Sequence, residues 1–582
     1  MVEKGEQTVR VVFERNVACP MRDGVTLRAN VFRPEEGGPY PVILTRLPYG
    51  KDTGFAYGLL DPIRLAEAGY IVVIQDVRGC FASEGEFAGF AQEFQDGYDT
   101  VEWASKLPGA DGQVGMFGAS YFAYTQWAAA ASGHPALKVL TPTVSFDDAW
   151  AGSAFRDGAF EWGLSASWYT TAMAIVELMR KKQGSPDFPE LFGRLVFDAN
   201  HLPEFGYHEL PLDQFSPLKR AGVLEDFFTQ LRHSTYDENW RAISIRPHYE
   251  KMQVSAYLVG GWYDVFLDST IGSFQSIRKN GQDARLLIGP WTHSNYSNAV
   301  GELDFGMAAN SSFLNFQYDS TTLHQLWFDQ QLKKLENPLA KEPPIKLFVM
   351  GENAWRYAGE WPLPETVWTP YYLHSDGHAN SINGNGSLNT TTPDEEAPDH
   401  YVYDPANPVP TTGGNLLMTP TFRPGPANQA VVEQRDDVLI FTSEALTEPL
   451  TVIGPVKAKL WIKTSAKDTD FVVRLTDVYP DGRSINLADG VQRMRYRDSI
   501  VVTELVEPGE VYAIEVNLWA TGNVFLPGHR VRVQVTSSNF PRWNRNLNTG
   551  ESNETTSAFI VAEQTLLHDA DHPSHIVLPV IP

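Results

Sequence analysis

The sequence predicts an α/β domain with a mostly parallel sheet, interrupted by a helical insertion and followed by an all-β domain. Strand and helix patterns alternate through residues 1–145, give way to helical patterns over 146–245, and resume over 246–345. Short strands separated by turns fill residues 346–582. We therefore predict one α/β domain built from the first and third segments, a helical lid from the second, and a β jelly roll from the last.

The strands of the α/β domain are recognised as short buried runs rich in Val, Ile, Leu and Phe. Strands that alternate with helices require right-handed crossovers, which produce a parallel sheet. The predicted strands are residues 41–45, 70–75, 113–117, 137–140, 254–259 and 284–288, with helices over 93–106 and 121–132.

The insertion and the C-terminal part carry different patterns. Residues 146–245 contain aromatic-rich helical runs and no good strand. The C-terminal part instead alternates apolar and polar residues, as half-buried strands do, and turn dipeptides such as Asp481-Gly482 separate the runs. The clearest of these runs are residues 456–463, 514–518 and 531–535.

Composition and charge exclude several classes of function. The chain has 582 residues, of which 43% are hydrophobic and 20% charged, which is ordinary globular usage. The net charge of −25 argues against a broad basic surface for nucleic acid. Cys19 and Cys80 are too few for a disulfide framework. No apolar export segment begins the chain and no apolar stretch approaches a bilayer span, so we expect a cytoplasmic protein without a membrane partner.

A serine at the start of a predicted helix is the first candidate for chemistry. Gly118-Ala-Ser120 follows the strand 113–117 and precedes the helix 121–132. A serine on such a turn exposes its hydroxyl, and the N–H of the next residue, Tyr121, faces a developing oxyanion. Because Gly-x-Ser recurs by chance, a serine that only caps the helix is the alternative.

A nucleophilic serine needs an imidazole to take its proton and a carboxylate to orient that imidazole. In α/β-hydrolases the acid and then the base follow the serine, each just after a strand. Asp264 follows the strand 254–259, and His293 follows the strand 284–288. Each alone would more often be a turn or surface residue, but three correct residue types in order predict a Ser120–Asp264–His293 triad.

The long separation between Ser120 and Asp264 places the lid between the sixth and seventh strands, above the site. Lid aromatics such as Trp168 suggest an apolar acyl or aryl pocket, although most of them are expected to form the core of the lid. Tyr49, in the loop after the third strand, is a candidate oxyanion donor, but the residues alone favour a surface tyrosine.

No motif indicates a cofactor or a metal. Residues 50–53 lack the glycine spacing and the Ser or Thr of a phosphate-binding loop. Only His568 and His572 have the spacing of a helical zinc motif, but Pro573 adjoins them and no glutamate lies between them. We therefore predict neither a cofactor nor a metal.

The motifs around the three predicted residues are specific enough to suggest a family. They read Gly-Met-Phe-Gly-Ala-Ser120-Tyr, Gly-Gly-Trp-Tyr-Asp264 and Gly-Pro-Trp-Thr-His293-Ser-Asn. These motifs resemble those of the bacterial cocaine esterase family, which is grouped with X-prolyl dipeptidyl-peptidases, α-amino acid ester hydrolases and glutaryl cephalosporin acylases. The resemblance runs nearly end to end and is weakest across the lid.

The resemblance implies an α/β-hydrolase domain with a lid and a C-terminal jelly roll. It implies Ser120 as nucleophile, His293 as base and Asp264 as the residue that orients the base. It also implies that the Tyr49 hydroxyl and the Tyr121 N–H form the oxyanion hole. Positions of the family's acyl pocket match Phe266, Leu417 and Met418.

One departure from the relatives bears on the substrate. In α-amino acid ester hydrolases, carboxylates near the catalytic residues bind the ammonium group of the substrate. Here the positions after Asp264 hold Phe266 and Leu267, and Asp268 is the nearest acid. An uncharged, apolar acyl group is therefore favoured over an amino acid ester or an X-Pro peptide.

We predict a serine carboxylesterase that hydrolyses small-molecule esters with apolar or aromatic acyl groups through an acyl-enzyme. An acylase or X-prolyl dipeptidyl-peptidase that cleaves amide bonds is the alternative enzyme. Outside enzymes, the alternative is a ligand-binding protein with an inactive hydrolase domain. A homodimer is one candidate assembly.

Overall fold

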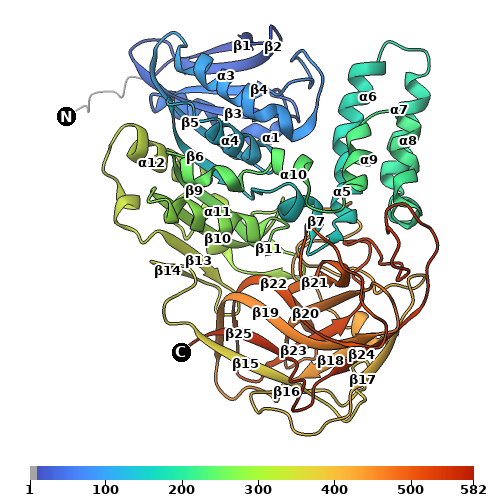
Figure 1. Cartoon of the computed structure of the whole chain (residues 1–582). Coiled ribbons are helices and arrows are strands. Elements are labelled where there is room, and N and C mark those ends of the chain that lie inside the picture. The colour runs from blue at the N-terminus through green and yellow to red at the C-terminus, as the bar shows by residue number, and fades with distance from the viewer. Residues whose placement is uncertain (1–8) are drawn as a thin grey trace.

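The computed structural model describes residues 9–582, and the first residues, examined for an export signal, lie outside this range. Figure 1 shows an α/β part in blue and green above a β-rich C-terminal part in orange and red, with a group of teal helices beside the former. Two large sheets of ten and eleven strands organise these two parts.

The ten-stranded sheet forms the α/β domain. Its six middle strands pair in parallel and correspond to the six strands that the sequence predicts, although the predicted runs 70–75 and 254–259 each begin one residue before the observed strand. In spatial order the strands are β1 (Val11–Pro20), β2 (Thr26–Pro34), β4 (Ile71–Asp76), β3 (Tyr40–Leu47), β5 (Ala110–Ala119), β6 (Leu137–Thr143), β9 (Ser255–Tyr263), β10 (Ala284–Thr292), β13 (Ile345–Val349) and β14 (Ala354–Ala358).

Helices cover both faces of this sheet. On one face Val42 and Leu44 of β3 belong to the same core as side chains of α3 (Glu93–Ser105), α4 (Tyr121–Ala131) and α11 (Leu267–Lys279). On the other face Ile43 belongs to a core shared with α2 (Pro62–Glu67) and α12 (Ser320–Leu332). Strands buried on both faces are nearly continuous apolar runs, which is why they can be recognised in the sequence.

The sheet extends further at both edges than the sequence patterns indicate. β13 and β14 continue it to Ala358, beyond the expected division at residue 345. β13 is fully buried and pairs in parallel with β10, which keeps it in this sheet. At the other edge β1 and β2 form an antiparallel pair whose mixed burial leaves no clear apolar run in β1.

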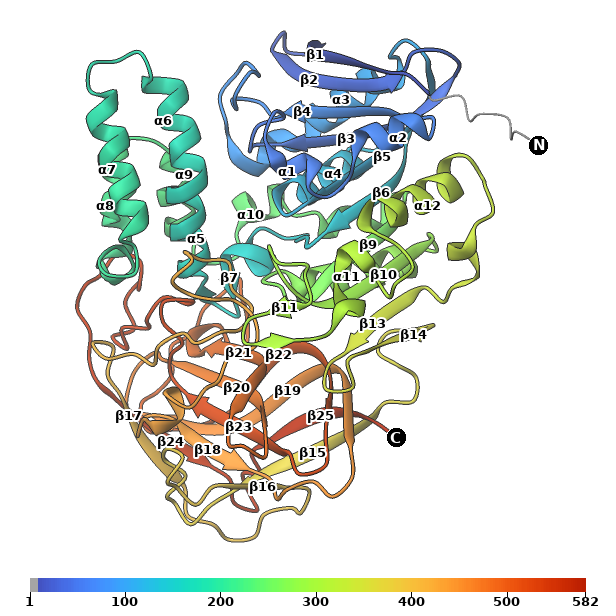
Figure 2. The same ribbon diagram turned by 180° about the vertical axis from the view of Figure 1, so that it is seen from behind.

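The lid consists of the segment between β6 and β9 and is mostly helical, as predicted. Its elements are the hairpin β7 (Phe155–Arg156) and β8 (Ala159–Phe160), and the helices α5 (Trp162–Trp168), α6 (Ala174–Lys182), α7 (Phe188–Asn200), α8 (Ser216–Ala221), α9 (Glu225–Arg232) and α10 (Glu238–Ala242). Both views show α6 to α9 standing as a bundle beside the α/β domain and above the β domain (Figures 1 and 2). Within residues 9–582, no helix has the length and apolar character needed to cross a membrane.

The C-terminal domain is all β, as predicted, and most of its strand pairs are antiparallel. The three predicted runs lie in β19, β22 and β23. The strands of this domain are β15 (Val367–His374), β16 (Ser387–Asn389), β17 (Asp399–Tyr403), β18 (Leu439–Thr442), β19 (Leu450–Thr464), β20 (Asp470–Val478), β21 (Ser484–Arg493), β22 (Val511–Phe525), β23 (Arg530–Thr536), β24 (Ala562–Leu567) and β25 (His575–Ile581).

Hydrogen bonds fix the base of the lid on the β domain. The Phe160 N–H donates to Asn544 Oδ1 at 3.0 Å, and the Asn544 N–H donates to the Phe160 carbonyl at 2.9 Å. The Gly163 N–H donates to the Arg542 carbonyl at 3.0 Å. Because Gly163 lies in α5, these bonds determine the position of the helix that ends at Trp168.

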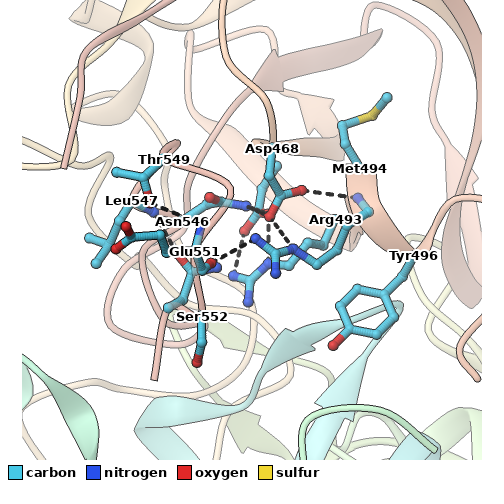
Figure 3. A network of polar contacts seen from close by, with 12 residues as sticks. Asp468, Arg493, Met494, Tyr496, Asn546, Leu547, Thr549, Glu551 and Ser552 are labelled. Atoms are coloured by element: carbon cyan, nitrogen blue, oxygen red, sulfur yellow. Dashed lines mark hydrogen bonds and ion pairs between the residues drawn. The ribbon is translucent and has the colours of Figure 1, made fainter. Parts of the chain in front are cut away.

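Asn544 also belongs to a buried polar network of the β domain, in which Figure 3 shows Asp468, Arg493 and Asn546 converging. Arg493 donates to both oxygens of Asp470 at 2.9 Å and to Asn544 Oδ1 at 2.9 Å. Asn546 donates to Asp468 at 3.0 Å and to Asp470 at 2.8 Å. Paired in this way, the charges are buried without an uncompensated carboxylate, and they hold the loop that contacts the lid.

His568 joins separate segments of the β domain through both of its ring nitrogens. Nδ1 lies 3.0 Å from Glu396 Oε2, and Nε2 lies 2.9 Å from Asp399 Oδ2. Both nitrogens can donate only in the protonated imidazolium. Burial lowers the pKa of His568, but the two carboxylates outweigh burial and hold the pKa above its ordinary value of 6.5.

We expect the protein to lose stability as the pH rises through the folded-state pKa of His568. The native state binds the His568 proton more tightly than the unfolded state does. The stabilisation from the two ion pairs is therefore complete below the unfolded-state pKa and is lost as the pH rises above the folded-state pKa. Thermal unfolding from about pH 6 to about pH 9 should show a steeper fall of Tm for the wild type than for His568→Gln. The control His572→Gln, which changes a partly exposed histidine paired with Asp569, should keep the wild-type slope. Equal slopes for wild type and His568→Gln would contradict this account.

Candidate active site

Ser120 lies in the sharp turn between β5 and α4. Its backbone has φ 56° and ψ −125°, a conformation that a side chain makes unfavourable by about 1–3 kcal/mol. Two residues earlier Gly118 has φ +147°, and a Cβ there would lie 2.5 Å from the Phe122 carbonyl oxygen. The turn therefore requires glycine at 118, and it places Ser120 where the first N–H groups of α4 have no partners within the helix.

Asp264 and His293 follow the neighbouring parallel strands β9 and β10. His293 Nδ1 lies 2.7 Å from Asp264 Oδ1, and both side chains are buried. The Phe266 ring stands perpendicular to the imidazole with centroids 5.0 Å apart. The carboxylate occupies Nδ1, so Nε2 is the ring nitrogen outside this contact, and His293 and Ser120 line the same cleft.

Glycines allow these two strand ends to approach each other. A Cβ on Gly261 of β9 would lie 2.3 Å from the Trp291 carbonyl oxygen of β10. A Cβ on Gly289 would lie 2.3 Å from the Trp291 ring. Gly261 therefore allows the two strands to approach, whereas Gly289 leaves room for the Trp291 ring of its own strand. These Gly and Trp residues, which the sequence pattern places in loops after the strands, lie within β9 and β10.

Tyr49 lies in the loop between β3 and α1 (Gly54–Tyr57), with its hydroxyl at the site. The Trp168 Nε1–H donates to the Tyr49 hydroxyl oxygen at 3.0 Å, so the hydroxyl keeps its own proton for another acceptor. Burial raises the pKa of Tyr49 to about 12, while contacts with Trp168 and Ser120 oppose this rise. Tyr49 is therefore a neutral donor beside Ser120 at ordinary pH.

Two cavities meet at Ser120, an inner one of about 40 Å³ and an outer cleft of about 620 Å³. Tyr49, Trp168 and Leu417 line both of them. The remaining walls are largely apolar. They include Phe90, Tyr121, Phe146, Leu164, Tyr169 and Phe266 in the inner cavity, and Phe55, Leu59, Phe122, Ile175, Val176 and His293 in the outer cleft.

Comparison with known proteins identifies the family. Residues 23–295 match the family model of the X-Pro dipeptidyl-peptidase (S15 family), and residues 337–577 match that of the X-Pro dipeptidyl-peptidase C-terminal non-catalytic domain. The chain is 40% identical to the cocaine esterase of Rhodococcus sp. (strain MB1 Bresler), over 97% of this chain and 98% of that protein. This chain belongs to the cocaine esterase family. It is a serine hydrolase.

Two solved structures match the chain over nearly its whole length. One is an aminopeptidase from a marine sediment archaeon, Thaumarchaeota archaeon, with a TM-score of 0.80, 26% identity and coverage of 100% of this chain and 99% of that one. The other is an α-amino acid ester hydrolase, with a TM-score of 0.80, 27% identity and coverage of 99% and 98%. The predicted fold class, an α/β-hydrolase domain with a C-terminal all-β domain, is confirmed.

The structure places three of the four predicted pocket residues at the cavities and the fourth beside them. Phe266 lines the inner cavity, and Leu417 and Trp168 line both cavities. Met418 lines neither of them. Its side chain packs on α5, where a Cβ on Gly163 would lie 2.5 Å from the Met418 sulfur. The lid helix thus occupies the side to which Met418 points, and a role of Met418 in substrate binding stays a prediction.

Among the lid aromatics, only some reach the cavities. Trp168 and Tyr169 line the inner cavity, whereas Phe155, Phe160 and Trp162 are fully buried and lie outside both linings. The sequence pattern could not separate these roles, because apolar side chains of a core and of a pocket have the same periodicity.

Sequence reasoning missed Asn415, which anchors the loop of the predicted acid. Its side-chain amide donates to the carbonyl oxygens of Trp262 and Asp264, both at 2.9 Å. Asn415 is buried and lies two residues before Leu417, so one loop of the β domain both supports the acid loop and lines the cavities. A single asparagine in a polar loop carries no signal that would have revealed this contact.

Neither cavity is lined by an Asp or Glu within residues 9–582. Asp268, the acid nearest to Asp264 in sequence, lines a different cavity together with Asp147 and Arg246. The same part of the chain contains no group of three or more His, Cys, Asp or Glu residues arranged to hold a metal ion. The described walls of both cavities at Ser120 therefore carry no carboxylate.

Gly261→Ala should disrupt the alignment of Asp264 with His293. The added Cβ would meet backbone of the adjacent strand, so the two strand ends must separate, and a displacement of about 1 Å lowers hydrolysis about 10²-fold. Rates on nitrophenyl acetate and thermal unfolding measure the effect. Gly272→Ala is the matched control, because it adds a Cβ with nothing within 4 Å in helix α11 and should retain activity. Wild-type rates for Gly261→Ala would rule out this packing constraint.

Proposed function

We propose that the protein is a carboxylesterase in which Ser120 is the nucleophile, His293 the base and Asp264 the residue that orients the base. The observation that carries this proposal is the buried Asp264–His293 hydrogen bond at 2.7 Å beside a serine held at positive φ. Membership of the cocaine esterase family supports an ester as substrate. The cytoplasmic location and the homodimer stay predictions from the sequence.

In the proposed reaction, Ser120 Oγ attacks the ester carbonyl carbon while His293 Nε2 takes the hydroxyl proton. The carbonyl oxygen becomes an oxyanion that accepts hydrogen bonds from the Tyr49 hydroxyl and the Tyr121 N–H. His293 then gives its proton to the departing alkoxide, which leaves as the alcohol. Water, deprotonated by His293, attacks the acyl-enzyme, and the acid product leaves with Ser120 restored.

The two cavities have different parts in this scheme. His293 must reach the oxygen of the leaving alcohol, and it lines the outer cleft. We therefore assign the alcohol to the outer cleft and the acyl group to the inner cavity, whose lining includes Phe90, Phe146 and Phe266. The inner cavity is much smaller than the outer cleft, about 40 Å³ against about 620 Å³, so we expect short acyl groups to fit it more readily than a benzoyl group.

The lining also favours esters over amino acid derivatives. A substrate ammonium in a site of this kind needs a carboxylate, and none lines either cavity among the described residues. Cleavage of amide bonds is the second candidate function, because the chain matches the S15 family model and is similar to the archaeal aminopeptidase. The paired Asp264 and His293 argue against the third, a ligand-binding protein with an inactive hydrolase domain.

Initial rates on nitrophenyl acetate, nitrophenyl benzoate and Ala-Pro-nitroanilide test the proposed function. We expect both esters to be hydrolysed far faster than the anilide, and Ser120→Ala to lower kcat by about 10⁴-fold or more with the fold intact. The ratio of benzoate to acetate rates measures how well the inner cavity accepts an aromatic acyl group. Dominant anilide cleavage would move the protein to the peptidase branch. Substantial ester turnover by Ser120→Ala would refute the nucleophile.

Tyr49→Phe should lower kcat by about 10²–10³-fold, because it removes one oxyanion donor. Trp168→Phe keeps an aromatic wall but removes the N–H that orients the Tyr49 hydroxyl, so kcat should fall by less than in Tyr49→Phe. In the double variant, Trp168→Phe should lower kcat little beyond the loss caused by Tyr49→Phe. Pre-steady-state rates of nitrophenol release measure the acylation step, and additive losses would show that Trp168 acts independently of Tyr49.

A further inference from the structure

A fully buried ion pair lies behind the proposed oxyanion hole. Arg46 Nη1 and Glu93 Oε2 are 2.7 Å apart, and neither side chain is exposed to solvent. Arg46 is in β3, three residues before Tyr49, and Glu93 is the first residue of α3. Burial of two charges costs several kcal/mol per ion before their attraction is counted, so such a pair is weak evidence for stability alone.

The second carboxylate oxygen of Glu93 contacts Tyr121, the residue that supplies the other donor of the proposed oxyanion hole. The Tyr121 hydroxyl donates to Glu93 Oε1 at 3.0 Å. Tyr121 is the first residue of α4, and its backbone N–H is the second proposed oxyanion donor. Burial and the charge of Glu93 raise the pKa of the Tyr121 hydroxyl well above its ordinary value, so it remains a donor to the carboxylate.

Further hydrogen bonds connect Arg46 to helix α4 and to strand β4. One turn into α4, the Thr125 hydroxyl donates to the Arg46 carbonyl oxygen at 3.1 Å, which links the helix directly to β3. The Arg46 Nε donates to Gln75 Oε1 of β4 at 2.8 Å, which fixes the plane of the guanidinium. The strand that leads to Tyr49 and the helix that begins at Tyr121 thus meet at one carboxylate.

We propose that Glu93 is a positioning residue that sets the spacing of the two oxyanion donors, Tyr49 and the Tyr121 N–H. It does so by holding Arg46 with one oxygen and the Tyr121 hydroxyl with the other. This inference rests on the proposed function, because the oxyanion hole is part of that proposal. Glu93 itself does not line either cavity at Ser120 and acts only through its partners.

The test compares Glu93→Gln with Glu433→Gln. Glu433 is a matched control in the β domain, since it is also buried, pairs with Arg532 at 2.5 Å and accepts from Gln534 at 2.8 Å. Both substitutions remove the charge of a buried Glu–Arg pair, and both should lower Tm. Glu93→Gln alone should lower kcat on nitrophenyl acetate, by about 10- to 100-fold, with little change in KM.

The Ki of a trifluoromethyl ketone inhibitor would not change if Glu93 had a purely structural role. The adduct of this inhibitor with Ser120 carries an oxyanion, so its Ki should rise in Glu93→Gln in proportion to the fall in kcat/KM. Glu433→Gln should leave both quantities within about twofold of wild type. A Glu93→Gln enzyme that is less stable but has wild-type kcat and Ki would overturn the inference.

Tyr121→Phe keeps the test decisive if Glu93→Gln does not fold. It removes only the hydroxyl, keeps the backbone N–H and leaves the Arg46–Glu93 pair intact, and we expect a smaller fall in kcat than for Glu93→Gln. Wild-type kcat in Tyr121→Phe would refute a route through Tyr121. If both variants fold, Glu93→Gln should have a reduced effect in the Tyr121→Phe background, and strict additivity would count against the proposal.

The two levels of proposal fail in different ways. If Ser120→Ala retains ester turnover, the proposed function is wrong. If Ser120→Ala is inactive while Glu93→Gln and Tyr121→Phe keep wild-type kcat, the esterase assignment stands and only the role of Glu93 is lost.

Discussion

The parallel register of the central sheet is the constraint on which the site depends. Parallel strands end at the same edge, and β5, β9 and β10 therefore deliver Ser120, Asp264 and His293 to one place from distant parts of the chain. Close approach of β9 and β10 at Gly261 then brings the carboxylate to 2.7 Å from the imidazole. The chemistry is thus local, but it is created by backbone pairing across the whole α/β domain.

The β domain is part of the site as well as a neighbour of it. Asn415 holds the carbonyls of the acid loop, and Leu417 lines both cavities from the same loop. Hydrogen bonds between the base of the lid and residues Asn544 and Arg542 fix the lid on the β domain, and through α5 they position Trp168 against Tyr49. The position of the Tyr49 hydroxyl therefore depends on the α/β domain, the lid and the β domain together.

Two buried ion pairs lie close to the parts of the chain that position the site. Arg46 with Glu93 lies behind the proposed oxyanion donors, and Arg493 with Asp470 lies in the network that contacts the lid. A buried pair gains little net stability over well-packed apolar residues, but its hydrogen bonds are directional, as dispersion contacts are not. Both pairs occur where segments distant in sequence must keep a fixed separation, which is consistent with a positioning role.

The sequence by itself indicated six parallel strands of the α/β domain, the turn at Ser120 and the order of the predicted acid and base along the chain, because these depend on local periodicity and on glycine at tight turns. It also indicated Tyr49, Phe266 and Leu417 through resemblance to the family. Only the tertiary structure decided that Met418 faces the lid and that Asn415, Trp168 and Glu93 meet their partners. Those contacts join residues far apart in the chain through the docking of lid and β domain, and no periodic pattern encodes such docking.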